Sequence, residues 1–268
     1  MRLWFPIAVV AGWAVLALAG SLWASDAAEV HLADVLRAPS ADAILGRDDL
    51  GRSVFARLVA GAQTSFFVAV CVTSISLALG TLIGTASAWI GGALDHWVVR
   101  IIDVFLAFPG ILLAIALAGI LGPGVSNVVI ALSVVGWVGF ARLARAQTLS
   151  LRQRPYLLGA IAIGARFPRI VWWHLLPGLV APLTVEATFA MAGAVIAEAG
   201  LSFLGLGAQP PAASWGTMIL QGMRYMLVAP HLVAVPGIAI FLVVLAINLL
   251  GDRLRDHLDV RAARDEER

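Results

Sequence analysis

The side chains able to perform covalent or metal chemistry are few in this chain and far apart. It contains no lysine, so it lacks the lysine that a Walker A loop places on nucleotide phosphates and the one that a Schiff base requires. A single cysteine, Cys71, excludes an internal disulfide. None of the five histidines has a second ligand at metal-site spacing; they are His31, His96, His174, His231 and His257. We predict no catalytic residue, no metal site and no enzymatic activity.

Arginine is instead concentrated in residues 142–177, which hold six arginines and no acidic residue. Within this segment, residues 154–168 predict a short helix, because Pro155 suits a first turn and Pro168 limits continuation. The helix is apolar and rich in small residues, and such a surface outside the bilayer marks a protein contact. A helix lying flat on the inner leaflet is the alternative. The predicted contact residues are Arg154, Tyr156, Leu157, Leu158, Gly159, Ala160, Ile163, Gly164, Arg166 and Pro177.

A second candidate site is one face of the apolar run that follows this loop. The residues on that face are Glu186, Ala190, Gly193 and Ala197. A carboxylate about two turns inside a membrane helix is costly unless it faces protein or water. We expect this face to line a translocation path. The alternative is that Glu186 pairs with a neighbouring helix or with a cytoplasmic arginine.

The elements that must position these residues are membrane helices. The composition is 61% hydrophobic and 13% charged, and the mean hydropathy is +0.94, which leaves too little polar surface for a water-soluble chain of this length. A hydrocarbon core of about 30 Å needs about 20 apolar residues per helix. We therefore predict an all-α membrane protein with six transmembrane helices, at residues 3–24, 65–90, 101–121, 125–141, 179–199 and 232–250.

The arginine distribution orients these helices. With the amino terminus inside, five basic residues lie outside and the other thirteen of the 18 lie in the cytoplasm, in keeping with the positive-inside rule. An even number of spans places both termini in the cytoplasm, and the protein is expected in the inner (plasma) membrane. The first span exceeds the apolar core of a signal peptide, which is about 7 to 15 residues. We predict an anchor there, with cleavage near Ala24 as the alternative.

The predicted organisation has four parts. They are a membrane helix at residues 1–24, a polar extracytoplasmic segment at 25–64, a five-helix core at 65–250 that includes the loop 142–178, and a cytoplasmic tail at 251–268. Apolar residues at helical spacing between Leu50 and Val59 predict an interfacial helix before the second span, against the alternative of a solvated loop.

Two patterns predict features of the helices themselves. Small residues at four-residue intervals in the second span, from Ser76 to Ala88, predict a smooth face on which another helix packs closely. Pro109 lies inside the third span, where its missing N–H and its ring are expected to kink the helix.

The loop also carries a family resemblance. Gly164, nine intervening residues and the sequence His174-Leu-Leu-Pro177 resemble the cytoplasmic loop of permease subunits of binding-protein-dependent ABC importers, whose pattern is EAA, three residues, Gly, nine residues, Ile-x-Leu-Pro. Three further stretches are similar to the dipeptide, oligopeptide and nickel permease family, and in their order to its second, C-type permease. They are residues 45–52, then 198–207 with Pro210-Pro211 and 214–216, and finally 251–259.

The chain departs from this family pattern inside the loop. Leu158 and Gly159 occupy the acidic and first alanine positions, and Pro155 stands where close relatives often have glutamate. An ion pair between such a glutamate and an ATPase is expected to be absent, or to be replaced by one from Arg154 or Arg166. Contact by shape is expected to remain.

The resemblance implies a type I ABC importer permease fold and a set of partners. These are a B-type permease, two ATPase subunits that carry ATP and Mg, an extracytoplasmic substrate-binding protein and membrane lipids, with no cofactor in this chain and no nucleic acid. It also implies that closure of the ATPases moves the helix around residues 156–164 as a rigid lever. The implied cargo is a di- or oligopeptide, with nickel or a metal chelate as the alternative.

Two hypotheses from other classes predict different sequences. An ion-coupled secondary transporter should show internal repeats with broken helices at matching positions, and the sequence has no such pairing. A structural membrane scaffold explains the apolar spans but leaves the basic loop helix unexplained.

Overall fold

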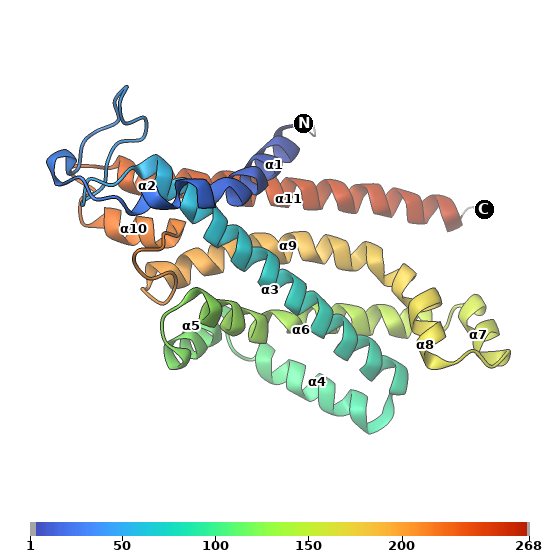
Figure 1. Cartoon of the computed structure of the whole chain (residues 1–268). Coiled ribbons are helices and arrows are strands. Elements are labelled where there is room, and N and C mark those ends of the chain that lie inside the picture. Colours follow the sequence, from blue (N-terminus) through green and yellow to red (C-terminus); the bar gives the residue numbers. More distant parts are fainter. Residues whose placement is uncertain (1–3, 267–268) are drawn as a thin grey trace. The chain divides into compact units, whose positions relative to one another are not determined.

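The computed structural model describes residues 4–266 and, within them, consists of helices joined by loops (Figure 1). The α-helices are α1 (Trp4–Ala19), α2 (Ala24–Ala28), α3 (Val54–Ile90), α4 (Gly92–Leu106), α5 (Gly110–Leu121), α6 (Val125–Leu151), α7 (Pro155–Ala162), α8 (Phe167–Ile170), α9 (Leu176–Phe203), α10 (Trp215–Met223) and α11 (His231–Glu266). Short 3₁₀ turns lie at η1 (Gly20–Trp23) and η2 (Leu32–Asp34), and one π-helical turn at η3 (Val171–Leu175). The all-α prediction is confirmed.

The two ends of the chain limit what is described. The predicted first span and the predicted tail each include terminal residues, 1–3 and 267–268, that lie outside the described residues. Arg2 and Arg268, both used to predict the orientation, are among them.

Five helical stretches are long and apolar enough to cross a membrane: Trp4–Leu22, Val54–Ile90, Val125–Leu151, Val171–Phe203 and His231–Leu258. A sixth span results if α4 and α5 are counted together, although the chain bends by 88° between them. The break falls at residues 107–109, where Pro109 has no N–H to continue the helix. The kink predicted at Pro109 is therefore present, and it divides the predicted third span into two helices.

Several boundaries differ from the prediction. Residues 45–53 are not helical, because Gly46 and Gly51 adopt left-handed backbone conformations with φ of 79° and 72° respectively. The separate interfacial helix is thus absent, and residues 54–64 instead form the first turns of α3. Likewise α6 continues to Leu151, so the first ten residues of the predicted loop 142–178 belong to a helix.

The chain forms two compact units, which are considered separately. The first contains residues up to 72 together with 114–132 and 191–250, and the second contains 73–113, 133–190 and the residues from 251 onward. In the first unit the ring of Trp13 packs edge-on against Phe66 with centroids 5.0 Å apart, and lies 6.1 Å from Trp215. The indole N–H of Trp215 donates to the carbonyl of Leu58 at 2.9 Å. These contacts join α1, α3 and α10.

The second unit is built on α6. Phe140 and Ala144 of α6 pack against Leu179 and Leu183 of α9 in one buried cluster. On α3, Gly84 lies against the backbone of α6, because a Cβ atom there would overlap the carbonyl oxygen of Ala141. The smooth face predicted in the second span therefore does serve close helix packing.

Candidate functional site

The predicted loop helix is present as α7, and its two ends have local causes. Pro155 occupies the first turn after Arg154, whose backbone is extended, so the missing N–H of Pro155 costs nothing. At the other end Gly164 takes a φ of 77°, and its N–H donates to the carbonyl of Ile161 at 2.9 Å. Gly164 thus ends α7 before Pro168, which lies in α8 rather than at the end of the predicted helix.

The inner side of α7 is part of a small core. Leu157 is fully buried and packs with Ile170 of α8 and Leu175 of η3. Partly buried Trp89 and Leu151 border this cluster. The cluster joins α7 to the turn that leads into α9, so displacing α7 must strain that turn or carry it along.

The outer side of α7 exposes apolar surface. Tyr156, Leu158, Ile161 and Ile163 are exposed, the last at 87%. Gly159 is exposed too, and a Cβ atom on it would meet nothing within 4 Å. An apolar surface of this kind next to arginines is typical of a docking site.

The structure divides the predicted contact residues into two groups. Leu157 and Ala160 are buried, so they support α7 from inside and do not face outward. The predicted residues that are exposed are Arg154, Tyr156, Leu158, Gly159, Ile163, Gly164, Arg166 and Pro177. All ten were predicted as contact residues, because the local sequence does not indicate the cluster that α7 forms with residues 170–175.

Arg145 and Arg152 of the predicted loop have structural partners in the second unit. Arg145 donates to both carboxylate oxygens of Asp95 at 2.6 Å each, joining α6 to α4. Arg152 donates to the carbonyl of Ala88 at 2.6 Å, and its guanidinium lies 5.3 Å from the ring centroid of Trp89. These arginines fix the end of α6, a role that spacing along the sequence does not indicate.

The predicted path residues all lie on α9 but belong to different units. Glu186 and Ala190 are half-buried in the second unit, and one carboxylate oxygen of Glu186 lies 3.3 Å from where a Cβ on Gly139 would stand. Within the part of the chain that the structure describes, Glu186 has no ion pair. Gly193 is exposed and Ala197 half-buried in the first unit.

A buried ionic network in the first unit was not predicted. Asp48 accepts hydrogen bonds from the Arg52 Nε at 2.7 Å and from a guanidinium nitrogen of Arg57. Its other oxygen accepts from the backbone N–H of Leu50 and of Arg52, each at 2.9 Å. Arg57 also donates to Gln221 of α10 at 2.7 Å. The network joins the segment before α3 to α10.

The charge of Asp48 is maintained despite its burial. Burial alone would raise the pKa of the Asp48 carboxyl, but the Arg57 guanidinium, the two backbone N–H donors and Arg52 together outweigh it and hold that pKa below its ordinary value. The only sequence signal for this network is the stretch 45–52, which contains Asp48 and Arg52 but not their partners on α3 and α10.

A second buried acid, Glu198, joins α3 to α9 within the first unit. Glu198 is 2% exposed and accepts hydrogen bonds from the hydroxyls of Ser65 at 2.8 Å and Ser202 at 2.7 Å. Nearby, Ser214 begins α10 with a capping box that it shares with Thr217. These contacts give a structural role to residues in the stretches 198–207 and 214–216. The sequence singled out these stretches only because they resemble the permease family.

Comparison with known proteins places these features in a family. The family model described as binding-protein-dependent transport system inner membrane component matches residues 76–264, a range that contains α7, η3 and α9.

Among the described residues, no group of three or more histidine, cysteine or acidic side chains is placed to hold a metal ion.

The chain is similar to curated relatives and to a solved structure. The glutathione transport system permease protein GsiD of Escherichia coli O157:H7 is 46% identical over 221 residues, which is 82% of this chain and 73% of the relative. The dipeptide transport system permease protein DppC of Alkalihalophilus pseudofirmus is 42% identical over 238 residues, 89% of this chain and 78% of the relative. A chain of the methionine ABC transporter MetNI, solved in inward-facing conformations, has a TM-score of 0.56 at 21% identity and covers 75% of this chain and 95% of its own length.

Proposed function

The chain belongs to the family of binding-protein-dependent transport system inner membrane components, and we propose that it is the permease subunit of an ATP-driven importer of di- or oligopeptides. Relatives named for glutathione and dipeptide transport, at 46% and 42% identity, support the peptide cargo. The coupling role is supported by the two sides of α7. Its outer side exposes apolar residues, and its inner side packs on the residues that lead into α9.

The proposed partners follow from this assignment. A B-type permease completes the pore, two ATPase subunits hydrolyse ATP with Mg, and an extracytoplasmic substrate-binding protein delivers the cargo. The amino and carboxyl termini and α7 lie in the cytoplasm, and the segment between α1 and α3 lies outside. Exposed arginines that flank α7, Arg154 and Arg166, support the cytoplasmic placement.

Force from the ATPases enters through α7. Docking of about 500 Å² of mostly apolar surface at about 25 cal/mol/Å² would contribute roughly 12 kcal/mol before the cost of association. Because Leu157 packs on Ile170 and Leu175, a displaced α7 moves the start of α9 with it. The face of α9 that bears Glu186, Ala190, Gly193 and Ala197 then changes its exposure to the path.

The coupling role is tested by placing a charge in the outer surface of α7. Ile161→Asp puts a carboxylate among exposed apolar residues without touching the inner cluster. We expect the variant to insert and assemble normally but to lose ATP hydrolysis stimulated by the loaded substrate-binding protein in proteoliposomes. Leu204→Asp, at an exposed leucine of the first unit, is the matched control. Undiminished stimulation in Ile161→Asp would count against docking on α7.

The cargo is tested separately with the same proteoliposomes. We expect saturable, ATP-dependent uptake of a labelled dipeptide and none of nickel ions supplied alone. Uptake of nickel with no peptide uptake would replace the peptide assignment while leaving the coupling role intact.

A further inference from the structure

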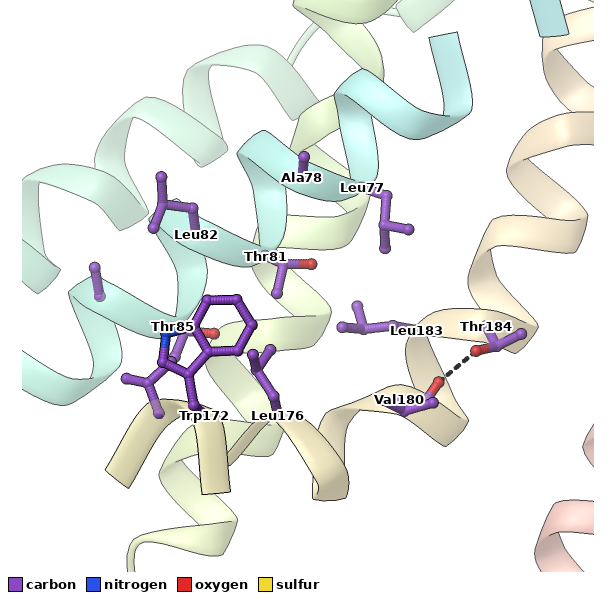
Figure 2. Close-up of a pocket in the computed structure, with 12 residues that line it drawn as sticks. Leu77, Ala78, Thr81, Leu82, Thr85, Trp172, Leu176, Val180, Leu183 and Thr184 are labelled. Carbon is purple, nitrogen blue, oxygen red and sulfur yellow. Dashed lines mark hydrogen bonds between the residues drawn. The ribbon is translucent and has the colours of Figure 1, made fainter. Parts of the chain in front are cut away.

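An apolar groove with a volume of about 570 Å³ lies between α3 and α9 in the second unit (Figure 2). One wall is the stretch of α3 from Leu77 to Ala86, and the other is formed by η3 and the first turns of α9, from Val171 to Thr184. Both walls belong to stretches long and apolar enough to cross a membrane. The groove is therefore a feature of the membrane region of the protein.

Two hydroxyl groups in this groove lack partners. The Oγ1 atoms of Thr81 and Thr85 are buried and have no hydrogen-bond partner within the described part of the chain, and Thr85 is only 4% exposed. The two residues stand one helical turn apart on α3, and Figure 2 shows the Thr81 hydroxyl oxygen directed toward the α9 side of the groove. A buried hydroxyl without a partner costs about 1–3 kcal/mol. The groove is thus suited to a ligand that is mainly apolar and carries acceptor oxygens.

The end of the groove formed by η3 carries residue types that are common at the level of lipid headgroups. Trp172 lines this end and is 69% exposed. Arg169 precedes it by three positions in the continuous helical segment of α8 and η3, and is exposed as well. Tryptophan is enriched at the level of lipid headgroups, and arginine pairs well with phosphate.

We propose that this groove binds one anionic phospholipid. An acyl chain lies between α3 and α9, the ester oxygens accept hydrogen bonds from Thr81 and Thr85, and the phosphate lies beside Arg169. A zwitterionic dipeptide fits the groove poorly, because it would lose hydration against an almost wholly apolar lining.

Quenching of tryptophan fluorescence by brominated lipid tests the proposal. The full chain is placed in phosphatidylcholine nanodiscs that contain the same mole fraction of either brominated phosphatidylglycerol or brominated phosphatidylcholine. The signal of Trp172 is obtained as the difference from Trp172→Phe. We expect about fivefold preferential quenching by the anionic lipid, the factor that corresponds to about 1 kcal/mol for one arginine at an anionic surface.

Variants separate the two parts of the site. Arg169→Ala should abolish the preference for the anionic lipid, and Ala78→Phe should reduce quenching by both lipids because the ring fills the groove. Arg224→Ala and Ala234→Phe, at exposed positions of the first unit, are the matched controls and should behave as the unchanged chain. Equal quenching by the two lipids would overturn the proposal in favour of bulk lipid contact. Absence of quenching, with cross-linking of Ala78→Cys to a partner permease in the assembled transporter, would overturn it in favour of a protein contact.

Discussion

At the scale of single residues, the most consequential side chain is Asp48. It lies 4% exposed between two guanidinium groups and two backbone N–H donors, and its Arg57 partner reaches Gln221 on α10. Both arginines are buried, and Asp48 is the carboxylate that contacts both of them; Asp49 lies 3.5 Å from Arg52 only.

Asp48→Asn is expected to destabilise the chain by about 3–5 kcal/mol, because it removes the negative charge that contacts both buried arginines, Arg52 and Arg57. The measurement is unfolding by denaturant in detergent micelles. Asp42→Asn is the control: Asp42 pairs with Arg37 at 3.4 Å, but its side chain is 83% exposed, so a loss of less than about 1 kcal/mol is expected. Equal losses in the two variants would contradict the importance of the buried network.

The same carboxylate predicts a pH dependence. The pKa of Asp48 is lowered in the folded chain, so its contribution is complete above the ordinary aspartate pKa of about 3.9 and is lost as pH falls through the lower folded value. The unchanged chain should therefore lose more stability than Asp48→Asn when the pH of an unfolding series is lowered from about 5 into the acid range. Parallel pH profiles for the two chains would exclude this linkage.

At the scale of elements, α7 has a buried side and an exposed side, and the neighbouring residues Leu157 and Leu158 lie on opposite sides. Leu157→Ala removes a fully buried side chain from the cluster with Ile170 and Leu175, so a loss of about 2–5 kcal/mol of local stability is expected. Leu158→Ala, at an exposed position, should change it by less than about 0.5 kcal/mol. Hydrogen exchange of the α7 amides measures the difference, and equal protection in both variants would show that the cluster does not hold α7.

Close packing of α3 on α6 gives a second prediction for an element. Gly84→Ala would bring a Cβ atom against the Ala141 carbonyl, so a loss of about 1–3 kcal/mol is expected from the forced separation of the helices. Gly119→Ala in α5, where a Cβ would meet nothing within 4 Å, should be neutral or up to about 1 kcal/mol stabilising. Thermal unfolding in micelles compares them, and a Gly84→Ala chain as stable as Gly119→Ala would refute the close approach.

At the scale of the whole molecule, the proposed orientation has a direct test. Asp42→Cys is expected to react with a membrane-impermeant maleimide in intact spheroplasts. Ile163→Cys should react only after the membrane is permeabilised, when the reagent reaches the cytoplasmic face. Both positions are exposed in the structure, so in a chain expressed without its proposed ATPase partners access depends on sidedness. Cys71→Ser serves as the background for both, because Cys71 is the chain's one cysteine. Reaction of both sites from the same side would contradict the orientation.

Much of the architecture could be predicted because apolar length and local signals determine it. Each predicted span corresponds to a helix or helix pair, Pro109 marks the break between α4 and α5, and Pro155 begins α7. What could not be predicted depends on partners distant in sequence. Arg145 and Asp95 are 50 positions apart, and Arg57 and Gln221 are 164 apart. No periodicity connects such pairs, so the structural arginines could not be distinguished from the exposed ones around α7.

The uninterrupted course of α3 has a mechanical consequence. Its 37 residues correspond to about 55 Å at 1.5 Å per residue, and they belong to the first unit up to Val72 and to the second from Thr73 onward. No proline interrupts its ladder of backbone hydrogen bonds. A sharp bend in α3 would therefore cost backbone hydrogen bonds that the hydrocarbon core cannot replace.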